Sequence, residues 1–225
     1  MIHTYDLIIR MTAVETRPDT KHRILDSAER LFAEYGFAGV SLRAIIADAK
    51  VNLAAIHYHY RSKEALFDAV ILRRLEPINR ERLALLDSYE QPTLEQILEA
   101  FLAPAFRVGA DPDGGPTFVR LMGRIFGEQI SGFSHLIKQH FGVVVERFTR
   151  ALHAAVPELP MSEVFWRLLF VGGALGNALR SCGQNLEALH GGLCDTSDVE
   201  GALRRLVSFS AAGFRAPVPS GVKHV

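Results

Sequence analysis

Apolar residues recur at helical spacing along most of this 225-residue chain, and no stretch alternates apolar and polar residues convincingly, as a half-buried strand would. Between residues 20 and 35, one side of a helix would carry Ile24, Ala28, Leu31, Phe32 and Tyr35. A stripe with this period is buried only if the segment is helical and packs against other helices. The sequence therefore predicts an all-α protein of about nine helices.

Capping residues and helix breakers divide the chain into the expected helices. Three short helices should lie near the N-terminus, at about 20–35, 42–49 and 53–59. Longer helices should follow at about 62–88, 93–108, 116–130, 134–155, 161–188 and 196–214. Pro77 lies inside the first long helix, and because proline removes a backbone hydrogen bond, we expect a kink or break near 73–77.

The helix lengths indicate two domains and two terminal segments. We expect an N-terminal arm at 1–18, a three-helix helix-turn-helix domain at 19–64, a larger helical domain at 65–215 and a tail at 216–225.

Composition excludes several classes of protein. Cys182 and Cys194 are too few for a disulfide framework or a zinc finger. The most apolar run, 168–179, is shorter than the roughly 20 residues of a membrane-spanning helix, and the first residues lack the apolar core of a signal peptide. We therefore expect a cytoplasmic protein with no membrane partner.

Net charge does not indicate a partner, because the chain has 25 basic and 25 acidic residues. The distribution is slightly uneven, however. From Arg17 to Arg74 there are ten basic residues, seven acidic residues and three histidines. This mild basic bias permits contact with nucleic acid without indicating it.

The stretch NLAAIHYHYRSKEAL (52–66) carries the clearest functional signal. It follows a tight break at 50–52, so the first three helices have helix-turn-helix proportions. If the apolar stripe of the second helix and Ile56 pack on the first helix, the start and flank of the third helix face solvent. The outward residues are then Asn52, Leu53, Ala54, Ala55, His57 and Tyr58.

These residue types suit the major groove of DNA. Small side chains let a helix approach the groove floor, where a methyl group can contact a thymine methyl. Donors to phosphates on either side would be Ser41, His57, Tyr58, His59 and Lys63. In the alternative interpretation Tyr60, and with it His59, closes the small core instead of contacting DNA.

The segment 36–70 resembles the DNA-binding domain of the TetR family of bacterial transcriptional regulators. The matching features are Gly-Phe after the first helix, Ser-Leu-Arg at the start of the second, the aromatic and histidine run, and Ser-Lys-Glu-Ala-Leu at the start of the fourth. The resemblance implies base-reading positions at Arg43, Leu53, Ala54 and Ala55. It implies phosphate contacts at Ser41, His57, Tyr58, His59 and Lys63.

Two positions depart from the family pattern. His57 stands where the family commonly has tyrosine. Lys50 occupies the turn position that is usually glycine. Lys50 must therefore adopt a left-handed or strained conformation that glycine takes freely.

The larger domain has more apolar residues than a spacer needs, and these either pack its core or line a ligand pocket between helices. The pocket candidates are Phe101, Phe118, Arg120, Leu121, Met122, Ile125, Phe126, Phe165, Trp166 and Phe170. Arg120 would anchor a carboxylate or form a salt bridge within the domain. Segments 117–128, 135–148 and 165–176 resemble a TetR subgroup that includes regulators of fatty-acid degradation, which implies a long-chain fatty acid or its CoA ester as effector.

The resemblance also implies a two-fold symmetric homodimer formed by the last two long helices. One short recognition helix reads only a few base pairs, so useful specificity requires two half-sites of a palindromic operator. The hypothesis is a repressor that a small apolar effector releases from double-stranded DNA. An activator with the same fold is the alternative.

An enzyme and a protein-interaction module are the competing classes. The sequence has no nucleophile elbow, phosphate-binding loop, dinucleotide fingerprint or zinc-protease motif. His57 and His59 are two residues apart rather than four, so they do not form a zinc-binding pair on a helix. We therefore expect no enzymatic activity, no metal and no cofactor.

Overall fold

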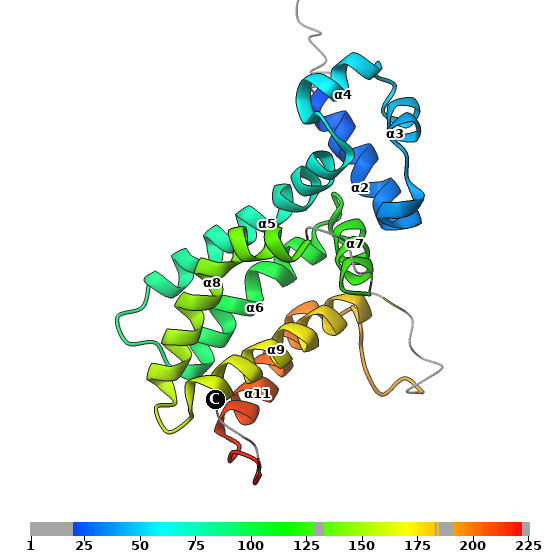
Figure 1. Ribbon diagram of the computed structural model, residues 1–225. Helices are drawn as coiled ribbons and strands as arrows, with labels where there is room; N and C mark the ends of the chain where they lie inside the picture. The colour runs from blue at the N-terminus through cyan, green and yellow to red at the C-terminus, as the bar shows by residue number, and fades with distance from the viewer. Residues whose placement is uncertain (1–19, 128–132, 183, 185–190, 222–225) are drawn as a thin grey trace, which may run out of the picture. The chain divides into compact units, whose positions relative to one another are not determined.

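The computed structural model of the chain describes residues 20–127, 133–182, 184 and 191–221. These residues form nine helices and no strand (Figure 1), so the all-α prediction is confirmed for the described part of the chain. Two compact units divide between Val70 and Ile71. The predicted arm at 1–18 lies outside the described residues.

The smaller unit consists of three helices and the start of a fourth. They are α2 (Thr20–Gly39), α3 (Leu42–Ala49), α4 (Leu53–Tyr60) and the first turns of α5 (Lys63–Asp87). Ile24, Ala28 and Phe32 are completely buried, as the stripe predicts. Tyr35, expected on the same stripe, is 56% exposed, so the buried side of α2 ends at Gly36.

Gly36 also ends the regular part of α2. Its backbone angles, φ 75° and ψ 166°, are open to glycine and strained for other residues. The turn places the Phe37 ring between two others, with centroids 5.8 Å from Phe32 and 4.8 Å from Phe67. Because Phe67 belongs to α5, this aromatic cluster attaches the start of α5 to the end of α2.

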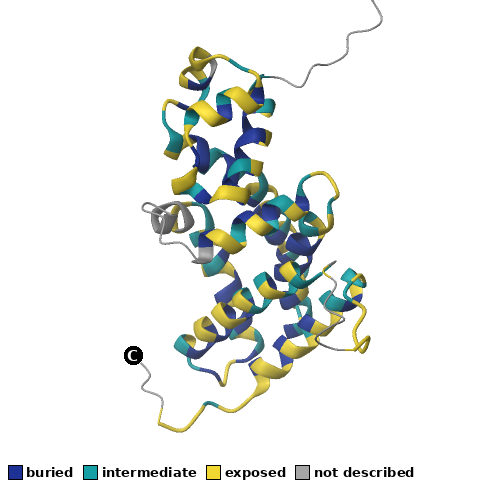
Figure 2. Cartoon of the chain, turned by 90° about the vertical axis from the view of Figure 1, so that its right-hand side faces the viewer, coloured by how far each residue is buried: buried dark blue, intermediate teal, exposed yellow. Residues whose placement is uncertain are grey.

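The larger unit is built around α6 (Leu94–Ala110). This helix packs against α7 (Gly115–Gly127), α8 (Phe133–Ala155), α9 (Met161–Ser181) and α11 (Val199–Arg215). Thr93 caps α6 by accepting a hydrogen bond from the backbone N–H of Gln96 at 3.3 Å, and the Gln96 side chain accepts one from the Thr93 N–H at 2.8 Å. The buried positions in Figure 2 form a continuous apolar core between these helices.

Of the kink or break predicted near 73–77 in the first long helix, the break does not occur. α5 runs without interruption from Lys63 to Asp87, with Pro77 inside it. Leu75 and Ile78, on either side of the proline, are buried. Their packing holds the helix together across the one backbone hydrogen bond that proline removes.

Both ends of α11 are fixed by side chains. At its C-terminal end, Nη1 of Arg167 donates to the carbonyl oxygens of Gly213 (2.8 Å), Phe214 (2.9 Å) and Ala216 (2.8 Å). A cation placed there satisfies carbonyls that have no partner within the helix. Arg167 comes from α9, so this contact joins the last two helices.

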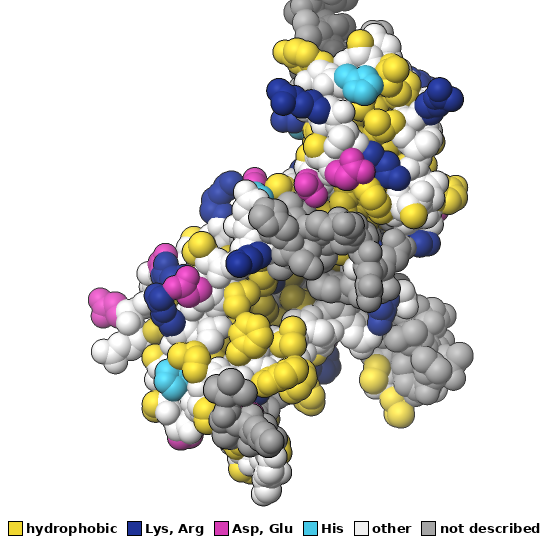
Figure 3. Space-filling view, viewed as in Figure 1, with side chains coloured by type: hydrophobic (Ala, Val, Ile, Leu, Met, Phe, Trp, Pro, Cys, Tyr) yellow, Lys and Arg dark blue, Asp and Glu magenta, His cyan; other side chains and the backbone are white. Residues whose placement is uncertain are grey.

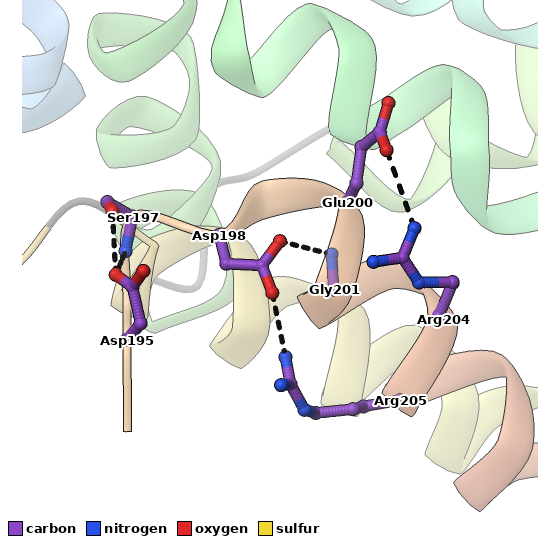
Figure 4. Close-up of polar contacts among 7 residues, drawn as sticks. All are labelled: Asp195, Ser197, Asp198, Glu200, Gly201, Arg204 and Arg205. Carbon is purple, nitrogen blue, oxygen red and sulfur yellow. Dashed lines mark hydrogen bonds and ion pairs between the residues drawn. The ribbon is translucent and has the colours of Figure 1, made fainter. Parts of the chain in front are cut away.

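The N-terminal end of α11 is capped by Asp198 (Figure 4). Its Oδ1 accepts a hydrogen bond from the backbone N–H of Gly201 at 2.7 Å, and its Oδ2 lies 3.3 Å from Nη1 of Arg205. The preceding turn is closed by Asp195, whose carboxylate accepts from the N–H and the hydroxyl of Ser197.

Candidate nucleic-acid interface

The turn between α3 and α4 determines the direction of α4. Lys50 has φ 53° and ψ 47°, which confirms the left-handed conformation expected at this position. The next N–H, of Val51, donates to the carbonyl of Ile46 at 3.2 Å and closes the end of α3. Nη2 of Arg23 on α2 donates to the Lys50 carbonyl at 3.3 Å, which ties the turn to the first helix.

One side of α4 packs into the core of the smaller unit. Ile56 is completely buried and Tyr60 is 5% exposed, four residues further along the helix. The Tyr60 hydroxyl donates to the carbonyl of Lys21 at 3.5 Å. The prediction that Tyr60 closes the small core is therefore confirmed. His59 is half-buried, and its ring centroid is 5.0 Å from that of Tyr58.

The other side of α4 faces solvent. Leu53 is 53% exposed and Tyr58 is 84% exposed. The other predicted residues whose side chains are described and exposed on this side are Asn52, Ala54 and His57. The backbone of Ala55 lies in α4, but its side chain is outside the described residues. Of the residues of α4 expected to contact DNA, Leu53, Ala54 and Tyr58 thus lie on one exposed face.

Ser41 and Lys63 at the flanks of this face have structural roles of their own. Ser41 caps α3, because its Oγ accepts from the N–H of Ala44 at 3.2 Å. Nζ of Lys63 lies 4.3 Å from the centroid of the Phe37 ring, a cation–π contact. Arg43, in the first turn of α3, is exposed.

Acidic side chains near this face are paired with other groups of the chain. Asp48, on α3, forms an ion pair with Arg30 of α2. A hydrogen bond from Ser27, together with Arg30, lowers the pKa of the Asp48 carboxyl. In the first turn of α5, backbone hydrogen bonding and Ser62 lower the pKa of Glu64. Both carboxylates are therefore anionic at neutral pH with their charge partly compensated.

One exposed cation beside this face was not among the predicted residues. Arg61, between α4 and α5, is exposed and has a left-handed backbone with φ 59°. The Ser62 N–H donates to the Tyr60 carbonyl at 2.6 Å across this turn. One signal in the sequence could have indicated it, namely an arginine directly before the Ser62 cap of α5.

This geometry has the features of a helix that enters the major groove. The exposed side of α4 begins with small and apolar side chains, and hydroxyl, imidazole and ammonium donors flank it. Such a helix presents its first turns to base edges while donors at its sides contact phosphates.

The candidate pocket residues whose side chains the structure describes are divided between the core and the surface of the larger unit. Phe101, Phe118, Leu121 and Ile125 are buried in the core. Met122 packs against that core. The Phe126 side chain lies outside the described residues.

Four candidates face solvent instead. Phe165, Trp166 and Phe170 are 49%, 52% and 64% exposed, and Arg120 is exposed as well. These side chains are exposed because the opposite faces of their helices pack into the core. α9 buries Val164, Leu168, Val171 and Leu175. Arg120 lies two residues from the buried Phe118, on the opposite side of α7.

A groove of about 450 Å³ lies between α8 and the start of α9. It is mostly apolar, and Phe141, Val145, Met161 and Phe165 are among its lining residues. Among the pocket candidates whose side chains are described, Phe165 alone lines it.

Within the described residues, no group of three or more metal-binding side chains comes together, and none of the helices there is long and apolar enough to span a membrane.

Two stretches of the chain match one protein family. Residues 24–70 match the family described as bacterial regulatory proteins, tetR family. Residues 99–213, about half of the chain, match the tetracyclin repressor-like C-terminal domain. The first match contains α3, α4 and the candidate interface, and the second contains most of the larger unit.

Among curated relatives, the chain is 39% identical over 62 residues to the HTH-type transcriptional regulator UidR of Escherichia coli K12. The matching stretch covers 28% of this chain and 31% of UidR. The chain therefore spans less than a third of the length of this relative.

Two solved structures share the fold over most of the chain. A regulatory protein of the tetR family from Rhodococcus RHA1 has a TM-score of 0.66 at 17% identity, covering 86% of this chain and 96% of that one. The fatty acid degradation regulator FadR of Bacillus halodurans has a TM-score of 0.64 at 13% identity, covering 88% and 98%. These proteins and UidR are described as regulators, not enzymes.

Proposed function

The chain belongs to the TetR family of bacterial regulatory proteins, and from that membership we propose that it is a cytoplasmic repressor that binds a palindromic DNA operator as a homodimer. A small apolar effector releases it from the operator. Activation through the same DNA contacts is the second possibility.

The observation that carries this proposal is the division of α4 into two faces. Ile56 and Tyr60 are buried, while Tyr58 is 84% exposed. The fold therefore holds this short helix firmly by one side and leaves a tyrosine, a histidine and small side chains on the other. The packing of the smaller unit needs none of these exposed side chains.

The proposed homodimer explains a second exposed surface, on α9 and α11, which pack against each other. The large apolar side chains exposed there are Met161, Phe165, Trp166, Leu169, Phe170 and Phe209. Figure 3 shows hydrophobic side chains gathered over the larger unit. An apolar patch of this kind marks an interaction site, and the same two helices of a second copy would cover it in a two-fold arrangement.

Glycines on α9 support the approach of another helix at this surface. A Cβ atom placed on Gly172, Gly173 or Gly176 would meet no atom of the described chain within 4 Å. The spacing of these glycines therefore leaves room for a neighbouring backbone rather than satisfying packing within the unit.

The proposed effector acts through a helix that belongs to both units. α5 begins at Lys63 and ends at Asp87, while the units divide after Val70. A ligand that binds the larger unit can change DNA affinity only if it binds the DNA-binding state and the released state of the protein with unequal affinities. To change the ratio of the two states from 99:1 to 1:99, the ligand must bind one state about 10⁴-fold more tightly than the other. The similarity to FadR supports a long-chain fatty acid or its CoA ester as this ligand.

Fluorescence-anisotropy titration of the protein onto labelled DNA from upstream of its own gene tests this function. We expect binding to weaken by about 10³-fold or more between 50 and 200 mM salt if six or more phosphates are engaged. We also expect a long-chain fatty acid or its CoA ester, each tested separately, to release the DNA. If the protein selects no sequence from a random DNA pool, the regulator proposal is wrong. Tight binding without release would refute only the effector.

A further inference from the structure

A buried arginine in the larger unit has no ionic partner among the residues that the structure describes. Arg82, on α5, is 4% exposed. Its Nε donates to the carbonyl of Phe101 at 2.7 Å, and its Nη1 donates to Oδ1 of Asn79 at 3.2 Å. Among the described residues, no carboxylate forms an ion pair with this guanidinium. Its contacts are to neutral groups.

Two aromatic rings flank the same guanidinium. The carbon atom at its centre lies 4.3 Å from the centroid of the Phe101 ring and 5.3 Å from that of Phe141. Cation–π contacts replace part of the lost hydration. Burial nevertheless lowers the pKa of Arg82 to about 9, which leaves it cationic at neutral pH. A buried charge without a counter-ion is unfavourable, so an anion brought to this position is bound favourably.

Phe141 connects Arg82 to the groove between α8 and α9. It lines that groove of about 450 Å³ and also flanks the guanidinium. Another residue of the same groove, Thr149, has a buried hydroxyl with no hydrogen-bond partner among the described residues. The groove thus combines an apolar wall, an unused hydroxyl and a cation behind one aromatic ring.

We propose that Arg82 anchors the effector, an amphipathic monocarboxylate whose apolar part lies in the groove and whose carboxylate pairs with the guanidinium after the Phe141 ring turns aside. This inference rests on the proposed function, because it names the chemical class of the effector. An arginine is suited to the role, since its planar fork can bind both carboxylate oxygens.

A purely structural role is the competing explanation. Asn79 donates to the carbonyl of His140 at 3.1 Å, so Asn79 and Arg82 together join α5, α6 and α8. A structural arginine would affect folding stability only. It would not distinguish an acid from its uncharged amide, and that difference separates the two roles.

Isothermal titration of the full-length protein with decanoate and with decanamide measures this distinction without DNA. Both probes have the same chain, and only decanoate carries a charge. We expect decanoate, kept below its micelle concentration, to bind about tenfold or more tightly than decanamide. Equal affinities would overturn the proposal.

Three variants test whether Arg82 is the residue that causes decanoate to bind more tightly than decanamide. Arg82→Gln should bring the acid-to-amide ratio of affinities close to one. Asn79→Asp retains Arg82 and gives it an internal carboxylate, so it should weaken decanoate binding and leave decanamide binding unchanged. Lys138→Gln removes an exposed cation of the same groove and is the control, with an expected ratio like that of the wild type.

The proposal is wrong if the preference for decanoate survives Arg82→Gln or Asn79→Asp, or if Lys138→Gln removes it. Should Arg82→Gln fail to fold, Asn79→Asp still decides, since it keeps the cation. Operator binding is measured separately by anisotropy. A protein that binds DNA but not decanoate loses only this inference, whereas one that binds decanoate but no DNA loses the proposed regulator.

Discussion

Tyr58 and Tyr60 lie two residues apart on α4 and are 84% and 5% exposed. Tyr58→Phe should weaken operator binding by about 1.5–3 kcal/mol, the value of one hydrogen bond to a charged group such as phosphate, without changing thermal stability. Anisotropy and thermal melting measure the two effects. The control is Tyr35→Phe, which alters another tyrosine that is 56% exposed. Equal losses in both variants would remove Tyr58 from the interface.

Lys50 has a left-handed backbone with φ 53°. Replacing it with glycine should stabilise the protein by about 1 kcal/mol, because glycine has no Cβ to strain in this conformation. Urea unfolding measures the change. The control is Ala47→Gly, at an exposed helical position of α3, which should lose about 1 kcal/mol. If Lys50→Gly is less stable than the wild type, the contacts of the lysine side chain contribute more stability than its left-handed backbone costs.

At the scale of elements, the start of α7 depends on a close approach of two backbones. A Cβ atom on Gly115 would collide with the carbonyl oxygen of Val108 and lie 2.8 Å from that of Gly109. Gly115→Ala should therefore destabilise the protein by about 1–3 kcal/mol. Gly123, on the same helix, has no described atom within 4 Å of such a Cβ. Gly123→Ala should be neutral or stabilise by up to about 1 kcal/mol in the same urea titration.

The cap of α11 should make stability depend on acid. The hydrogen bond from the Gly201 N–H lowers the pKa of Asp198 from its usual 3.8. A carboxyl with a lower pKa in the folded state contributes stability above its usual pKa and loses it as pH falls. Asp198→Ala should therefore lower the Tm at neutral pH, and the difference from the wild type should shrink below about pH 3.8. A difference independent of pH would mean that the charge of the cap does not matter.

At the scale of the whole molecule, the proposed operator binding requires two copies of the chain. Leu169→Glu places a charge in the middle of the exposed apolar face of α9 and should give a folded monomer with much weaker operator binding. The control is Leu193→Glu, because Leu193 is 88% exposed but lies outside α9 and α11. Analytical ultracentrifugation measures the masses. A Leu169→Glu variant that stays dimeric would refute this dimer surface.

The sequence by itself determined the features that depend on neighbouring residues. Helical periodicity predicted the all-α fold, and Thr93 and Gly36 marked helix ends, because caps and breakers act within a few residues. The two faces of α4 also followed, since the spacing of Ile56 and Tyr60 is the spacing of one helix side.

Only the tertiary structure decided which apolar face of a helix lies inside. On α9 both the buried set with Val164 and the exposed set with Phe165 are apolar, and periodicity cannot rank two apolar faces. The unbroken α5 depends likewise on burial of Leu75 and Ile78 around Pro77. Arg82 was not among the predicted ligand-binding residues. It contacts Phe101 and Phe141, which are distant from it in the sequence, and no local pattern of residues predicts such contacts.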